Sequence, residues 1–149
     1  MTVWPDEFEA HGKHVGIVPL QPHHGLDLAE VIKRGNLDRH WYAFIPEPGK
    51  VGEEIERRNN LRHEGIMQPF AVIDKRIGKA VGMTTYMNID PQTPWLEIGS
   101  TWYCRSVQRT ELNTECKLVL LLRNAFENLN YSAVEFRTHV MSQQSSVAI

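Results

Sequence analysis

The sequence predicts a mixed α/β fold, in which a mostly antiparallel sheet is completed by one long helix and a final parallel strand. Three segments carry this prediction. Residues 95–103 alternate between two sets of side chains, which is the pattern of a β-strand. Residues 114–129 place apolar side chains three and four positions apart, as an amphipathic helix does. Residues 133–140 alternate again, so a right-handed crossover should make the strands on either side of the helix parallel neighbours.

The other segments predict the remaining elements. From the N-terminus we expect an irregular arm at 4–13, a strand at 14–20, a helix at 22–33 stopped by Gly35-Asn36, a polar helix at 51–63 ended by Gly65, strands at 69–74 and 79–88, and a turn at 89–94. Gly78 lies in the turn between the two strands, where a positive φ angle would close a hairpin. Residues 142–149 resemble the opening of another helix.

Side-chain positions follow from these periods. Four residues of the strand at 95–103 should share one face, namely Leu96, Ile98, Ser100 and Trp102. The apolar face of the long helix is expected to contain Leu118, Leu121, Leu122, Ala125, Phe126 and Leu129. Asn113 or Thr114 can cap the start of this helix, and Glu115 falls in its first turn, where the helix dipole favours an anion. Asn130 can adopt the left-handed conformation that ends it.

The polar loop at 104–113 delivers the strand into the helix. Backbone N–H groups at such a helix start have no partner within the helix and can bind a phosphate or pyrophosphate. An ordinary strand–loop–helix crossover that binds nothing is the alternative.

Length and composition limit the classes of function that the chain can have. The chain of 149 residues is one domain's worth, with 42% hydrophobic and 23% charged residues and a net charge of -2. No run of like charge favours nucleic acid or a membrane surface, and the apolar run at 118–122 is too short to span a bilayer. The N-terminus has no signal-peptide pattern, and Cys104 and Cys116 lack CxxC spacing, so a cytoplasmic protein is expected. The seven histidines have no ligand spacing, and no metal site is expected.

Four strings carry a family resemblance. They are Glu97-Ile98-Gly99-Ser100-Thr101-Trp102, the run from Gln108 to Glu115, Val134-Glu135-Phe136-Arg137-Thr138, and Ser142-Gln143-Gln144-Ser145. Together with the order of elements, they resemble the GNAT superfamily of acetyl-CoA-dependent N-acetyltransferases, and within it the ribosomal-protein N-terminal acetyltransferases. The resemblance covers nearly the whole chain and is most specific in its middle third.

The resemblance implies a GNAT-like fold, acetyl-CoA as the cofactor and a primary amine as the acceptor. The cofactor's pantetheine arm would bond to the backbone of Trp102, Tyr103 and Cys104. Its pyrophosphate would lie on the loop and helix start, which comprise Gln108, Arg109, Thr110, Glu111, Leu112, Asn113 and Thr114. Ser142 or Ser145 would hold the cofactor or cap the last helix.

Two further groups of residues are candidates for the acceptor side, the first from the resemblance and the second from the aromatic composition of residues 37–45. Glu97 is the candidate general base, and a salt-bridged carboxylate on the strand face is its alternative. Trp41 and Tyr42 belong to an aromatic cluster that would line the substrate mouth or form a contact over the core.

Two departures from the family pattern favour a second hypothesis. Glu111 occupies a position where the loop motif has glycine, and a carboxylate beside a pyrophosphate costs roughly 3–4 kcal/mol at an effective dielectric constant of ~20. The chain also ends at Ile149, where the family normally continues into further strands, so residues 1–149 would be a C-terminally abbreviated single domain.

The strand at 133–140 would then be an edge strand, which we expect a homodimer or a swapped segment to cover. The leading hypothesis is an N-acetyltransferase. The alternative is a disabled or non-catalytic protein of the same fold with weak or no CoA binding, and a third is a different α/β domain that shares the strand–loop–helix pattern.

Overall fold

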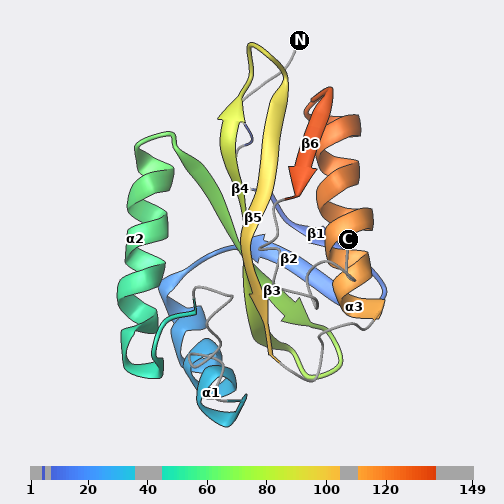
Figure 1. Cartoon of the computed structure of the whole chain (residues 1–149). Helices are drawn as coiled ribbons and strands as arrows, with labels where there is room; N and C mark the ends of the chain where they lie inside the picture. Colours follow the sequence, from blue (N-terminus) through green and yellow to red (C-terminus); the bar gives the residue numbers. More distant parts are fainter. Residues whose placement is uncertain (1–4, 6–7, 36–44, 105–110, 137–149) are drawn as a thin grey trace.

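The protein is built around one six-stranded sheet with strand order β1-β2-β3-β4-β5-β6 (Figure 1). The computed structural model describes the chain except for residues 1–4, 6–7, 36–44, 105–110 and 137–149. Its strands are β1 (Ala10–His11), β2 (Val15–Pro19), β3 (Met67–Asp74), β4 (Lys79–Asp90), β5 (Trp95–Tyr103) and β6 (Ala133–Phe136). Its helices are α1 (Gly25–Gly35), α2 (Val51–His63) and α3 (Glu111–Thr114), which continues as π-helix through Glu115–Leu122 and Asn124–Asn128. Two short 3-10 turns, Pro22–His24 and Pro48–Lys50, precede α1 and α2.

The helices form two layers on opposite sides of the sheet. Figure 1 shows α1 and α2 on one side and α3 on the other. Neighbouring residues of β4 point to opposite faces, and they contact different helices. Thr85 accepts a hydrogen bond from Arg58 of α2, whereas Tyr86 donates one to the Leu121 carbonyl in the π-helical part of α3. Each face of β4 is therefore fixed to its helix by a buried polar contact.

The strand pairings confirm the predicted topology. β1 to β5 pair antiparallel in sequence order, and β6 pairs parallel to β5 from Trp95↔Ala133 to Ile98↔Phe136. Gly65 and Gly78 have positive φ angles of 75° and 66°, as the helix end and the hairpin turn require. The predicted arm contains β1, and β3 and β4 each extend two residues beyond their predicted bounds. The predicted strand at 133–140 is confirmed as far as Phe136, and the remainder lies outside the described residues.

The predicted alternation of β5 is wrong beyond Gly99. Ser100 has a φ angle of 49°, and Ser100 and Thr101 together oppose the single residue Thr84 of β4. This β-bulge inserts one residue and reverses the order of faces. Trp102 consequently lies opposite Met83, on the face shared with Glu97, and not with Leu96 and Ile98.

The start and the winding of the long helix also differ from prediction. The helix begins at Glu111 rather than Thr114, so neither Asn113 nor Thr114 is its cap; both lie within the first turn. From Glu115 onward the chain is wound as π-helix, in which hydrogen bonds span five residues. The buried residues Cys116, Leu121 and Ala125 follow this wider spacing, and Phe126, predicted on the buried face, is 43% exposed.

Among the described residues, no helix has the length and apolar character needed to cross a bilayer.

Candidate functional site

The candidate base Glu97 lies in the middle of β5, on the sheet face covered by α2. It is 4% exposed, and its partner in the register is Met87 of β4. The side-chain amide of Asn88 donates a hydrogen bond of 2.7 Å to Glu97 Oε1. Asn88 has a φ angle of 48° in an irregular part of β4, and it is exposed. The carboxylate is thus held by a fixed donor at the border between sheet and solvent.

Gly99 provides the space that the Glu97 carboxylate occupies. A Cβ atom at Gly99 would lie 2.9 Å from Glu97 Oε2 and 2.8 Å from Met87 Sδ, both closer than real Cβ contacts. The carboxylate therefore folds over residue 99 along the strand. The next residue is the bulged Ser100, whose exposed hydroxyl lies 3.7 Å from Met87 Sδ. Thr101 turns to the other face, where its hydroxyl meets that of Thr84 at 2.8 Å.

A buried charged cluster from α2 lies on the same face. Arg58 is 1% exposed; its Nε donates to Glu54 Oε2 at 2.8 Å and its Nη1 to Thr85 Oγ1 at 3.0 Å. Arg57 donates two hydrogen bonds to the same carboxylate, at 2.7 and 2.8 Å. Burial raises the pKa of Glu54, but the two arginines outweigh it and the net pKa is lowered. Burial lowers the pKa of Arg58, and the pairing with Glu54 opposes that shift.

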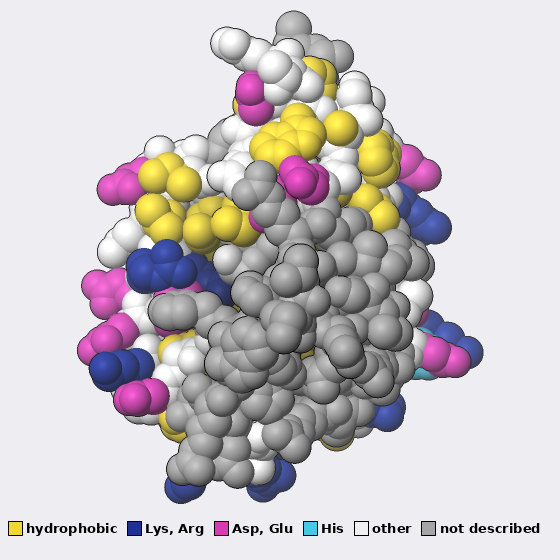
Figure 2. Space-filling view, viewed as in Figure 1, with side chains coloured by type: hydrophobic (Ala, Val, Ile, Leu, Met, Phe, Trp, Pro, Cys, Tyr) yellow, Lys and Arg dark blue, Asp and Glu magenta, His cyan; other side chains and the backbone are white. Residues whose placement is uncertain are grey.

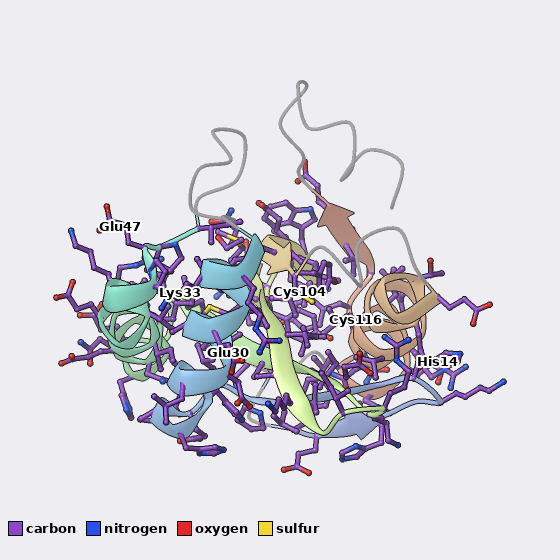
Figure 3. All side chains as sticks on the ribbon, turned by 90° about the horizontal axis from the view of Figure 1, so that it is seen from below. His14, Glu30, Lys33, Glu47, Cys104 and Cys116 are labelled. Atoms are coloured by element: carbon purple, nitrogen blue, oxygen red, sulfur yellow. The ribbon has the colours of Figure 1, made fainter. Side chains whose placement is uncertain are left out.

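The start of α3 is linked to the turn between β1 and β2. Glu115 accepts backbone hydrogen bonds from His14 at 2.8 Å and from Val15 at 3.0 Å. Burial raises the pKa of Glu115, but these bonds, with one from Lys13, lower it overall. The Glu111 carboxylate is exposed and lies 3.1 Å from His14 Nε2. Figure 3 shows His14 beside α3, so both acids at this helix start face the same turn.

The residues expected along the pantetheine arm lie at the C-terminal end of β5 and directly after it. Trp102, Tyr103 and Cys104 are all buried, and the Cys104 N–H donates to the Val81 carbonyl. Burial, with a smaller contribution from Cys116, raises the pKa of Tyr103 well above its ordinary value. Cys104 and Cys116 are both buried as thiols inside the molecule (Figure 3). The Trp102 indole N–H has no hydrogen-bond partner in the part of the chain that the structure describes.

Some of the predicted site residues lie outside the described residues. They are Trp41, Tyr42, Gln108, Arg109, Thr110, Ser142 and Ser145. Leu112, Asn113 and Thr114 form the first turn of α3. The structure thus brings together Glu97 and the end of β5, with the start of α3 on the opposite face.

Three contacts of the site were not predicted from the sequence. The Asn88–Glu97 and Arg58–Thr85 hydrogen bonds join different elements, so no local spacing indicates them. Only the four-residue interval between Glu54 and Arg58, which places both on one helix face, was a usable signal. Figure 2 shows hydrophobic side chains in the upper part of the view, on both the α2 side and the α3 side of the molecule.

A separate cavity of about 530 Å³ lies at the β2 end of the sheet. Its lining includes Val18, His23, His24, Asp27 and Ala80. His24 is buried and its Nδ1 accepts the Gln21 backbone N–H at 3.0 Å. Burial and the neighbouring His23 lower the pKa of His24 below 6.5, although Asp27 opposes the shift. The cavity contains none of the predicted site residues.

Comparisons with known proteins agree with the fold. Residues 14–148 match the family model described as Acetyltransferase (GNAT) domain. No curated protein sequence is significantly similar to the chain. A GCN5-related N-acetyltransferase from Brucella melitensis is 25% identical with a TM-score of 0.80, over 99% of this chain and 67% of that one.

Two further solved structures share the fold at lower identity. The ribosomal-protein-S5-alanine acetyltransferase from Vibrio fischeri is 14% identical with a TM-score of 0.71, over 95% of this chain and 80% of that one. Mycobacterium smegmatis RimJ in complex with CoA-disulfide is 15% identical with a TM-score of 0.74, over 90% of this chain and 66% of that one.

Proposed function

The chain belongs to the GNAT family of acetyltransferases, and we propose that it transfers the acetyl group of acetyl-CoA to a primary amine. The observation that carries the proposal is the buried Glu97 carboxylate of β5, which Asn88 of β4 holds and which folds over Gly99 next to the bulge at Ser100. A fixed carboxylate at a sheet interruption suits a general base, because positioning is a large part of such catalysis.

The proposed mechanism needs one proton acceptor from this chain. Acetyl-CoA supplies an acyl group activated as a thioester. Glu97 Oε2 takes a proton from the amine, directly or through water, while Asn88 keeps Oε1 in place. A carbon–nitrogen bond forms, the carbon–sulfur bond breaks, and the departing thiolate takes up a proton.

We propose that the cofactor binds at the start of α3 and along the end of β5. The first N–H groups of a helix attract phosphate oxygens, and α3 begins directly after the proposed loop. The Glu111 carboxylate does not preclude this site, because it is exposed and paired with His14. When His14 is protonated, its positive charge lies beside the carboxylate of Glu111, the residue that replaces the glycine of the family motif.

We propose a protein N-terminal amine or a small amine as the acceptor. The resemblance of the sequence to ribosomal-protein acetyltransferases and the shared fold of the Vibrio fischeri enzyme support the first. We also propose a homodimer in which a second chain covers β6, the outer strand of the described sheet. The competing hypothesis is a protein of this fold that no longer binds CoA.

The test combines binding with chemistry. Calorimetry with acetyl-CoA and CoA on the unmodified chain and on Glu111→Gly should give micromolar binding by both. Acetylation is then followed by mass spectrometry, using alkylamines and peptides that begin with Ala, Ser, Thr or Met. We expect product from at least one amine and a loss on the order of a hundredfold in Glu97→Gln with unchanged CoA binding. Binding only by Glu111→Gly would support the disabled alternative, and a fully active Glu97→Gln would exclude Glu97 as the base.

A further inference from the structure

We propose that Arg58 is a positioning residue for the reaction: through Thr85 it fixes β4 opposite Gly99 and so keeps the Glu97 carboxylate in place. The inference rests on the proposed role of Glu97 as the base. It assigns a function to a buried charged cluster that the proton transfer itself does not use.

A hydrogen bond and a strand pairing lead from α2 to the glycine over which the proposed base, Glu97, folds. Arg58 Nη1 donates to Thr85 Oγ1 at 3.0 Å, and both residues are buried. Thr85 is paired with Gly99 in the β4–β5 register, and directly opposed residues of antiparallel strands share a face. Glu97 Oε2 lies 2.9 Å from the position of a Cβ on Gly99. A shift of β4 at Thr85 therefore changes the surface on which the Glu97 carboxylate rests.

Arg58 is held at two points, as a positioning group must be. Its Nε is fixed by Glu54, which also accepts two hydrogen bonds from Arg57, and its Nη1 reaches the sheet. The guanidinium plane is rigid, so two bonds define both its location and its orientation. β4 needs such a support here, because the bulge at Ser100 and the irregular pairing between Met87 and Asp90 interrupt its ladder with β5 on both sides of this point.

Stability alone is a poor explanation for this arrangement. Replacing a buried ion pair by well-packed apolar side chains is often neutral or stabilising. The neighbouring Arg57 gives the comparison that separates the two explanations. It contacts the same carboxylate from a half-exposed position, and its hydrogen bonds end at Glu54, whereas Arg58 also reaches β4.

The test compares Arg58→Met with the matched control Arg57→Met, and adds Thr85→Val and Thr85→Ser. Kinetics use the peptide acetylated best by the unmodified chain. In Arg58→Met and Thr85→Val we expect kcat to fall roughly tenfold to a hundredfold, with KM for acetyl-CoA changed less than about twofold. Arg57→Met and Thr85→Ser should keep kcat within about threefold. Equal losses in Arg57→Met and Arg58→Met, or an unchanged kcat in Thr85→Val, would overturn the proposal.

Crystal structures of the same variants provide a readout that needs no activity. The Glu97 carboxylate should leave its position over Gly99 in Arg58→Met and Thr85→Val and keep it in Arg57→Met. If the unmodified chain acetylates no amine, the proposed function fails, and these structures still decide the positional claim. An unmoved carboxylate in Thr85→Val would refute it. That variant removes one hydroxyl and leaves the Arg58–Glu54 pair intact, so it serves if Arg58→Met does not fold.

Discussion

Gly99 is the residue on which the position of the proposed base, Glu97, depends. Because a Cβ there would lie 2.9 Å from Glu97 Oε2, any side chain at this position must displace the carboxylate or the Met87 thioether. We expect Gly99→Ala to lower kcat by on the order of tenfold or more and to leave CoA affinity nearly unchanged. Steady-state kinetics and calorimetry check this. Gly52→Ala is the control, because a Cβ at Gly52 meets nothing within 4 Å. Full activity in Gly99→Ala would show that the carboxylate can act from another place.

Glu115 is the residue whose loss should cost most stability at the start of α3. Its carboxylate accepts the backbone N–H groups of His14 and Val15, which Ala would leave without this acceptor. We expect Glu115→Ala to lower the free energy of unfolding by about 1–3 kcal/mol. Urea denaturation measures the loss. Glu127→Ala, which removes an exposed carboxylate 3.9 Å from Arg123 on the same helix, should change stability by less than about 0.5 kcal/mol. Equal effects of both changes would contradict the proposed link.

At the scale of elements, Tyr86 determines how α3 packs on the sheet. Its hydroxyl donates to the Leu121 carbonyl at 2.6 Å and accepts from the Asn124 amide at 3.3 Å. Asn128 joins this network by donating a hydrogen bond to Asn124 Oδ1. Burial raises the pKa of Tyr86, so the hydroxyl stays protonated as this network needs. The network lies in the stretch where the helix is π-wound.

Removing this hydroxyl should therefore be costly. We expect Tyr86→Phe to lower the free energy of unfolding by about 1–3 kcal/mol, because it leaves the Leu121 carbonyl and the Asn124 amide short of a partner. Tyr131→Phe is the matched control, since the buried Tyr131 hydroxyl has no hydrogen-bond partner among the described residues and its loss should be neutral. Chemical denaturation of both variants compares them. A Tyr131→Phe loss as large as that of Tyr86→Phe would disprove the assignment.

The elements divide into those that local sequence specifies and those that it does not. The order of β2 to β6 and the crossover through α3 follow from periodicity and turn residues such as Gly65 and Gly78. The bulge at Ser100 and the π winding after Thr114 do not follow from local sequence. They are accompanied by contacts between elements, such as Thr84 with Thr101 and Tyr86 with Leu121. The same limit applies to the site. Glu97 was predicted from its motif, whereas the Asn88–Glu97 and Arg58–Thr85 contacts form only in the folded sheet.

At the scale of the whole molecule, stability should fall with acid in two stages. The pKa of His24 is lowered in the fold, so its contribution is complete above 6.5 and is lost as pH falls through the folded value. The pKa values of Glu54, Asp74 and Glu115 are also lowered, and their contributions are complete above the ordinary carboxyl values and lost below them.

We expect the urea midpoint to be constant from pH 7 to 8, to decline below 6.5, and to drop more steeply below about 4.5. Replacing His24 by Gln, which keeps an acceptor for the Gln21 N–H, should remove the first decline and spare the second. Unfolding monitored by tryptophan fluorescence at half-unit intervals measures both. A flat profile between pH 5 and 7 in the unmodified chain would contradict the role of His24.

The edge of the sheet makes a prediction about assembly. If a second chain covers β6, light scattering at tens of micromolar should give twice the mass of one chain. Replacing the partly buried Val134 on β6 by Pro should shift the mass toward the monomer, since proline removes a ladder donor. The control is Glu135→Lys on the same strand, because it alters the charge and keeps the backbone donor. Proline at Val18 is not a suitable control, because it would disrupt the interior of the sheet. A single-chain mass in the unmodified protein would rule out the dimer.

The contact between Glu115 and the β1–β2 turn also makes two amide protons internal reporters. The N–H groups of His14 and Val15 point to a carboxylate carried by α3, although the two segments are about a hundred residues apart in the chain. Any ligand that draws the start of α3 toward itself would lengthen or shorten these two bonds together. Their chemical shifts and hydrogen-exchange rates would then record occupancy of the helix start, without any label introduced into the site.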